Sequence, residues 1–262
     1  MGPRRTAPPG RTGVSTTGPL VGRHAVREAL RAGRPLTRLL LADTLHPREA
    51  DAFRAMARER RVPVAVVPRA RLDALAGGLA HQGVAAWPAA APTRTEADME
   101  AILAACEEPP FVLVLDDIQD PQNLGAILRV ADGAGAALVV IPERRGAGLT
   151  PVVDRVSAGA ASWVPVVRVV NLRRAITRLK DLGLVVWAAD PGAARVYTEV
   201  DWRGPVALVV GNEGKGVRPV VLRECDGAVR LPMAGRLASL NAATAAAVLA
   251  FEVRRQRGWR IR

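Results

Sequence analysis

The sequence predicts an α/β protein in two parts, a small N-terminal α/β domain and a larger C-terminal domain built around a parallel sheet. Apolar stretches of strand length alternate with amphipathic helical stretches from residue 20 onward. The later strands are apolar throughout, which is typical of a parallel sheet covered by helices on both faces. A stretch rich in proline and alanine separates the two parts. We therefore predict domains over 19–90 and 110–262, with a linker over 91–109.

The N-terminal part begins with a segment that contains too little apolar material to form a core. Residues 1–18 are rich in Pro, Gly, Arg and Thr, so we expect a flexible basic tail. After it, the spacing of apolar residues predicts a compact α/β domain. Its expected helices span 24–33, 46–61 and 70–78, and its expected strands span 36–42, 62–67 and 83–89.

The linker is expected to carry a short acidic helix and to end at a double proline. Beyond it, strands are predicted over 111–115, 137–141, 163–169, 183–189, 205–210 and 228–233, and a last helix follows Asn241. That helix is rich in alanine and therefore slim, which favours close packing, including packing between subunits.

Charge and composition point to a nucleic-acid partner. Residues 1–90 hold 15 Arg and 6 acidic residues, a net charge of +9, whereas the rest of the chain has 22 Lys and Arg against 19 acids, or +3. A basic domain favours nucleic acid first and an anionic membrane second, and a solvated basic surface is the plain alternative. Only 9 of 262 residues are aromatic, too few for a stacking platform for single strands. Structured RNA read by its shape fits better.

Metal, disulfide and membrane chemistry are not indicated. Cys106 and Cys225 lie far apart and the three histidines are isolated, so we expect no metal site and no disulfide. No stretch approaches the roughly eighteen apolar residues of a membrane span, and the N-terminus lacks the apolar core of a signal peptide. A cytoplasmic protein is expected.

Three segments place glycine and polar side chains directly after an apolar stretch. They read DPQNLGAILRVADGAG from Asp120, LVVGNEGKGV from Leu208 and LPMAGRLASLN from Leu231. In parallel sheets, ligands bind beyond the carboxyl ends of the strands, and all three segments fall there. The sequence therefore predicts one composite site.

Each residue of these segments also has a simpler interpretation. Asn123 fits a helix cap, Gly125 gives room for a close neighbour, and either Ser239 or Asn241 can cap the last helix. Arg129 lies about 140° around its helix from the buried Leu124, on the solvent side. The glycines of GNEGKG match neither a P-loop nor a dinucleotide fingerprint, so a tight turn is the alternative there and a nicotinamide-dependent oxidoreductase ranks last.

Taken together and in this order, the segments resemble the SpoU, or TrmH-like, branch of the SPOUT RNA methyltransferases over Pro110 to Arg257. The residues that carry the resemblance are Asp116 to Pro121, Asn123, Gly125 and Arg129; Gly211, Glu213 and Gly216; and Leu231 to Met233, Gly235 and Ser239 to Asn241. The N-terminal segments VGRHAVREAL and HQGV resemble the small ribosomal-protein-like, RNA-binding substrate domain of bacterial enzymes that methylate ribose in large-subunit ribosomal RNA. His24 and the stretch Ala242 to Thr244 depart from the usual pattern.

The resemblance implies an S-adenosylmethionine-dependent 2′-O-ribose methyltransferase with no metal, a homodimer formed by catalytic domains, and a deep trefoil knot. It implies structured RNA as substrate, most closely a guanosine of 23S rRNA. A transfer RNA, an antibiotic-site nucleotide, or a non-catalytic role in RNA binding or ribosome assembly are the alternatives. The donor-binding residues that it implies are Gly211, Asn212, Glu213, Gly216, Leu231, Met233 and Leu240, and the catalytic ones are Arg129, Asn123, Glu213, Ser239 and Asn241. Arg129 is expected to stay charged, bind a phosphate and stabilise the developing alkoxide.

Overall fold

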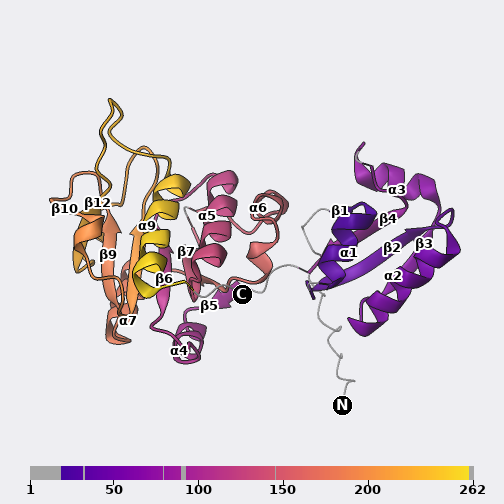
Figure 1. The fold of residues 1–262 in the computed structure, drawn as a ribbon, viewed down its shortest axis with the longest axis horizontal. Coiled ribbons are helices and arrows are strands. Elements are labelled where there is room, and N and C mark those ends of the chain that lie inside the picture. The colour runs from indigo at the N-terminus through magenta and orange to yellow at the C-terminus, as the bar shows by residue number, and fades with distance from the viewer. Residues whose placement is uncertain (1–18, 32, 79, 90–92, 145, 260–262) are drawn as a thin grey trace, which may run out of the picture. The chain divides into compact units, whose positions relative to one another are not determined.

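A computed structural model describes residues 19–31, 33–78, 80–89, 93–144 and 146–259 (Figure 1). The chain divides into two compact units, residues 1–90 and 91–262, and each is described by itself. The tail expected over residues 1–18 lies outside the described residues. None of the described helices has the length and apolar character that a membrane crossing requires.

The first unit is a four-stranded mixed sheet packed with three helices. Its strands, in the order β1-β4-β2-β3, pair antiparallel except for β2 with β3, which are parallel. The core packs around the fully buried Phe53 and Leu39. The elements are β1 (Leu20–Val21), α1 (Arg23–Arg31), β2 (Leu36–Ala42), α2 (Pro47–Glu59), β3 (Val64–Val67), α3 (Arg69–Ala76) and β4 (Val84–Pro88).

The second unit contains an eight-stranded sheet, and every neighbouring pair of strands in it is parallel, as predicted. The order is β10-β12-β9-β11-β6-β7-β8-β5. The strands are β5 (Thr93–Thr95), β6 (Phe111–Leu115), β7 (Leu138–Pro142), β8 (Val166–Val169), β9 (Val185–Ala189), β10 (Arg195–Val196), β11 (Val206–Val210) and β12 (Gly227–Arg230). The last of these ends at Arg230, three residues earlier than expected, because the chain leaves the sheet to form the loop that begins at Leu231.

Helices cover both faces of this sheet. Successive residues of β6 alternate between two cores: Leu113 packs with α5 and α9, while Val112 and Val114 pack with α4, α7 and α8. Helices α5 and α9 contact each other along one face (Figure 1). The helices are α4 (Asp98–Ala104), α5 (Pro121–Ala134), α6 (Pro151–Val156), α7 (Leu172–Asp181), α8 (Pro219–Leu222) and α9 (Ala242–Arg257).

The segment expected to be a linker over 91–109 belongs instead to the second unit. Its strand β5 pairs with β8 at the edge of the sheet. Its acidic helix α4 buries Met99 and Leu103, which lie on one face because they are four residues apart. The short acidic helix predicted in this segment is present, and the segment packs as part of the second unit.

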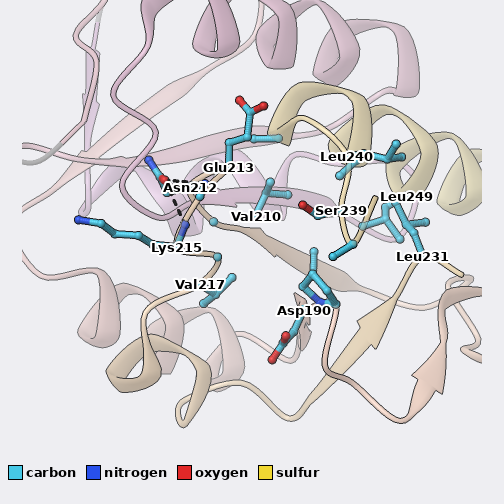
Figure 2. A pocket seen from close by; sticks show the side chains of 18 of the residues that line it. Asp190, Val210, Asn212, Glu213, Lys215, Val217, Leu231, Ser239, Leu240 and Leu249 are labelled. Carbon is cyan, nitrogen blue, oxygen red and sulfur yellow. Dashed lines mark hydrogen bonds between the residues drawn. The ribbon is translucent and has the colours of Figure 1, made fainter. Parts of the chain in front are cut away.

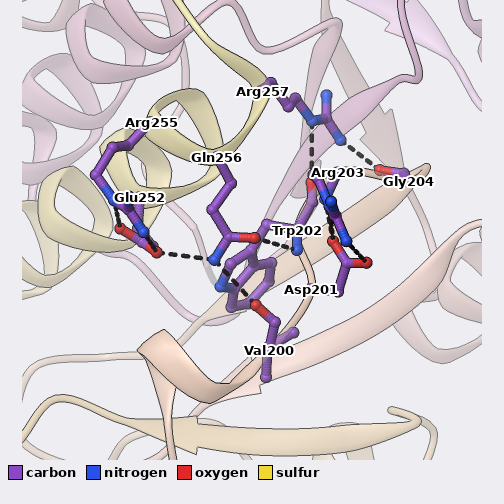
Figure 3. Close-up of polar contacts among 9 residues, drawn as sticks. All are labelled: Val200, Asp201, Trp202, Arg203, Gly204, Glu252, Arg255, Gln256 and Arg257. Carbon is purple, nitrogen blue, oxygen red and sulfur yellow. Dashed lines mark hydrogen bonds and ion pairs between the residues drawn. The ribbon is translucent and has the colours of Figure 1, made fainter.

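The far end of α9 is fixed by polar contacts near the amino ends of β6 and β11 (Figure 3). The side-chain amide of Gln256 donates to the carbonyl of Val200 at 3.0 Å and accepts from the backbone N–H of Trp202 at 2.9 Å. The guanidinium of Arg257 donates to the carbonyls of Trp202 and Gly204, and burial lowers its pKa. Because this end of α9 is held at the amino ends of the strands, the first residues of α9 lie at the carboxyl ends.

We predict that Gly125→Ala weakens the packing of α5 on α6. A Cβ there would lie 2.7 Å from Cβ of Val156 and 3.0 Å from the carbonyl oxygen of Val153, which confirms that Gly125 makes room for a neighbour. Overpacking costs about 1–3 kcal/mol and the gain in helix propensity returns about 1 kcal/mol. Urea unfolding should show a net loss, whereas the control Gly148→Ala, which meets nothing within 4 Å, should be neutral. Equal stability of both variants would contradict this packing.

Candidate functional site

A cavity of about 340 Å³ opens at the carboxyl ends of β9, β11 and β12 (Figure 2). Two of the three predicted segments form its walls, the loop that follows Val210 and the loop that begins at Leu231, and the start of α9 closes one side. All seven residues that the family resemblance implied for the donor line it: Gly211, Asn212, Glu213, Gly216, Leu231, Met233 and Leu240. The structure therefore brings these residues together.

The loop after β11 folds back on itself. The backbone N–H of Asn212 donates to the carbonyl of Gly216 at 3.1 Å, and the N–H of Gly216 donates to the carbonyl of Asn212 at 2.8 Å. The Asn212 carboxamide oxygen accepts from the N–H groups of Gly214 and Lys215. A Cβ on Gly211 would lie 2.1 Å from the carbonyl carbon of Gly216. Glycine is required at 211 because the loop contacts its own backbone there.

A buried ion pair holds the base of this loop. The Asp116 carboxylate, fully buried at the end of β6, accepts from the backbone N–H of Arg218 at 2.8 Å and from its guanidinium at 2.8 and 2.6 Å. These hydrogen bonds raise the pKa of Arg218. In addition, the Asn212 amide donates to the carbonyl of Asp117 at 3.1 Å. Asp116 and Asp117, which precede the first segment, thus support the loop, and no residue of the first segment lines the cavity.

The side chain of Asn241 connects the three segments. Its Nδ2 donates to Oδ1 of Asn123 and to Oε2 of Glu213, each at 2.9 Å. Its Oδ1 accepts from the backbone N–H groups of Ala243 and Thr244, so Asn241 caps α9. One amide therefore fixes the helix start, a residue of α5 and the carboxylate of the cavity loop.

Two cap interpretations are settled by these contacts. Asn123 is not a helix cap, because α5 begins at the cap Asp120, whose carboxylate accepts from the N–H of Gln122 at 2.9 Å. Asn123 lies three residues inside the helix and bonds Asn241 instead. Ser239 does not cap α9 either, and it lies on the rim of the cavity.

Arg129 stands apart from the cavity. It is exposed on α5, as predicted, and within the described residues it makes no hydrogen bond or ion pair. It does not line the cavity, and neither do Asn123 and Asn241, which reach it through Glu213. The implied catalytic residues therefore form a bonded cluster of three, a rim hydroxyl at Ser239 and a free guanidinium.

Sequence reasoning missed one wall of the cavity. Ala189, Asp190 and Pro191, at the end of β9, also line it. The rule that had identified the other loops applied here as well, since this strand ends in the polar turn Asp190-Pro191-Gly192. The apolar side is completed by Val210, Val217 and Leu249, whereas the Lys215 side chain extends away from it (Figure 2).

Within the described part of the chain, no three His, Cys, Asp or Glu side chains are grouped so that they could hold a metal ion. Burial raises the pKa of the Cys225 thiol to about 12, so this thiol stays protonated and is a poor nucleophile. His81 is buried and satisfied, with Asp73 at 2.8 Å and the N–H of Gly83 at 3.0 Å.

Comparison with known proteins covers both units. The SpoU rRNA Methylase family matches residues 110–251, and the RNA 2'-O ribose methyltransferase substrate binding family matches residues 19–91. The chain is 40% identical over 240 residues to the 23S rRNA (guanosine-2'-O-)-methyltransferase RlmB of Pseudomonas putida, which spans 91% of this chain and 96% of that protein. It is also 40% identical over 241 residues to a Bacillus subtilis protein named for the TrmH family of tRNA/rRNA methyltransferases, YacO, over 91% of this chain and 95% of that one.

Solved structures agree with these matches. The fold is similar to that of an AdoMet-bound rRNA methyltransferase from Sinorhizobium meliloti, with a TM-score of 0.74, 26% identity, and coverage of 91% of this chain and 87% of that chain. The SpoU methyltransferase AviRb from Streptomyces viridochromogenes, in complex with AdoMet, gives a TM-score of 0.70, 26% identity, and coverage of 91% and 90%. The chain belongs to the SpoU family of RNA methyltransferases.

Proposed function

We propose that the protein transfers a methyl group from S-adenosylmethionine to a ribose 2′-oxygen of structured RNA. One observation carries the proposal: the seven residues implied for the donor line a single cavity, and the cluster of Asn123, Glu213 and Asn241 adjoins it. The related structures with bound AdoMet and the match to the substrate-binding family support it.

The cavity suits this donor in size and chemistry. Its volume of about 340 Å³ falls within the range of about 300–1,000 Å³ of small-molecule sites. Apolar side chains of Leu231, Leu240 and Leu249 line one side and suit a flat purine, and the loops offer backbone groups for its polar edge. When bound, the donor supplies a methyl group on a positively charged sulfur, which is already a good leaving group.

The protein must then hold the 2′-hydroxyl in line with the methyl carbon, about 3 Å away, and stabilise the oxygen as its proton leaves. We assign this to Arg129, whose exposed guanidinium is free within the described residues to receive RNA. A guanidinium loses its proton only above about pH 12, so using it as a base at pH 7 would cost roughly 7 kcal/mol. Arg129 therefore acts as a cation beside the phosphate and the alkoxide, with water or phosphate taking the proton.

The proposed substrate is a guanosine of 23S rRNA, which the relation to the Pseudomonas putida enzyme supports. The alternative is a transfer RNA, because the Bacillus subtilis relative is named for both RNA classes. Mapping of 2′-O-methyl positions with and without the gene separates the two. If one 2′-O-methyl position of 23S rRNA disappears without the gene, the proposal is supported. If a position in tRNA disappears instead, the proposed substrate is wrong.

The proposal includes a homodimer of catalytic units and a knotted chain. Two half-exposed apolar residues one turn apart on the outer face of α9, Val248 and Phe251, support the dimer. The knot is implied by the resemblance to the SPOUT enzymes, which the SpoU family match supports. Sedimentation of the full chain tests the dimer directly.

We predict that Gly211→Ala weakens S-adenosylmethionine binding tenfold or more, because the added methyl group collides with the backbone of the loop. Calorimetric titration measures the effect. Gly148→Ala is the control, since its Cβ would meet nothing within 4 Å and it does not line the cavity. Wild-type protein that shows no binding at millimolar donor would overturn the proposed activity itself.

We predict that Arg129→Ala lowers kcat about 10²–10³-fold and leaves the donor dissociation constant unchanged, because the lost charge acts only on the acceptor side. Single-turnover transfer from labelled donor measures the rate. Arg129→Lys should retain part of the activity, since it keeps the charge without the planar fork. Methylation by Arg129→Ala at a near-normal rate would remove Arg129 from the mechanism.

We predict that Asn241→Asp separates capping from catalysis. The carboxylate still accepts from Ala243 and Thr244, so the midpoint of thermal unfolding should change little. The aspartate carboxylate cannot donate a hydrogen bond to Asn123 or Glu213, and it repels the Glu213 carboxylate. We therefore expect kcat to fall at least about tenfold. Asn241→Ala should lose about 1 kcal/mol of stability as well. Full activity of the aspartate variant would show that the cluster is only structural.

A further inference from the structure

The end of α2 places an arginine in a left-handed backbone conformation. The N–H of Val62 donates to the carbonyl of Ala57 at 2.8 Å, and the N–H of Arg61 donates to the carbonyl of Arg58 at 3.0 Å. This pair of bonds is a Schellman motif, in which the residue at position 61 must be left-handed. Arg61 has φ 55° there.

Glycine is the ordinary residue for that position. Helices α1, α3, α5 and α7 of the same chain are each followed by a left-handed glycine, at Gly33, Gly77, Gly135 and Gly183, whereas α6 ends in the same motif as α2 with Ala158 at φ 52°. A side chain with a Cβ is strained in this conformation. Arginine at 61 therefore lowers the stability of the helix end, and the fold gives no reason for it.

Further exposed arginines surround Arg61. Arg58 lies in the last turn of α2 and Arg60 is its C-cap, and Nη2 of Arg60 donates to the carbonyl of Arg31 at the end of α1, at 3.2 Å. Gly33 makes room for this contact, since a Cβ there would lie 3.1 Å from Nη1 of Arg60. We call Arg31, Arg58, Arg60 and Arg61 the basic end of the first unit.

Few acids compensate these charges. Glu28 pairs with Arg31 at 3.2 Å, and Glu59 is the other carboxylate of these helix ends. Within the described residues, Arg58, Arg60 and Arg61 take part in no ion pair, unlike Arg54 of the same helix, which pairs with Asp51. Of these four guanidinium groups, Arg31 is in an ion pair, and bidentate acceptors such as phosphates suit the other three.

We propose that the basic end binds phosphates of structured RNA and so supplies a defined part of the substrate contact. This rests on the proposed function, which makes RNA the partner. The contact is insensitive to base identity, as expected of phosphate recognition. A phosphate contact would give the strained arginine at position 61 a role that glycine could not supply.

The experiment uses the full chain, Arg61→Gly, and a fluorescein-labelled RNA duplex of about 20 base pairs, long enough for shape-based recognition. Glycine relieves the strain, so the unfolding midpoint should rise by about 2–4 °C. At the same time, RNA affinity should fall at least about threefold, and the slope of log affinity against log salt should shrink by about 0.7–0.9. The two changes in opposite directions distinguish an RNA contact from a solvated arginine.

Arg61→Lys should keep the affinity, and Arg61→Asn, which also tolerates the left-handed conformation, should lose it as glycine does. Arg203→Gln, which removes an exposed and paired arginine of the second unit, is the charge-matched control and should leave the salt slope unchanged. Unchanged affinity and slope in Arg61→Gly, or an equal loss in Arg203→Gln, overturns the inference.

The same preparations are tested for donor binding and methyl transfer. If wild-type protein neither binds the donor nor transfers methyl groups while Arg61→Gly still weakens duplex binding, the proposed function is wrong and the basic end remains an RNA-binding surface. If transfer is intact and the Arg61 variants bind RNA equally, only the inference falls.

Discussion

The side-chain amide of Asn241 is the contact on which the site depends. One end of the amide caps α9, and the other end donates to Asn123 on α5 and to Glu213 on the loop after β11. Asn123 and Asn241 lie 118 positions apart in the sequence. A single planar group with two donors and one acceptor therefore links the cavity loop to α5, the helix from which Arg129 projects. Gln is the only other residue with the same amide, and its longer side chain would place the donors and the acceptor differently.

The rest of the second unit keeps this group in place. The sheet sets the ends of β6, β9, β11 and β12 along one edge, and the buried pair of Asp116 and Arg218 ties two of them together. At the other edge, Gln256 and Arg257 hold the far end of α9. The helix is thus fixed at both ends, so the cavity is formed before a ligand enters. Preorganisation of this kind lowers the cost of binding and positioning.

Sequence reasoning predicted much of this. The apolar strands gave the parallel sheet, and three ordered motifs gave the family and the residues of the cavity. It did not find that Asn123 bonds Asn241, because a hydrogen bond between residues 118 positions apart leaves no periodic signal. It predicted a linker over a segment whose strand β5 joins the edge of the sheet and whose helix α4 packs on one face, because three-residue strands pair only through tertiary context. It also missed Asp190, since a polar turn after a strand is common and the turn lacks glycine-rich repetition.

The central claim is that this cavity delivers a methyl group to a ribose oxygen held beside Arg129. The most direct measurement is transfer of labelled methyl from S-adenosylmethionine to 23S rRNA, followed by complete digestion and separation of the nucleosides. We expect the label in one 2′-O-methylated nucleoside, which resists alkaline cleavage at its 3′ side. Label on a base, or none above a reaction without enzyme, would contradict it.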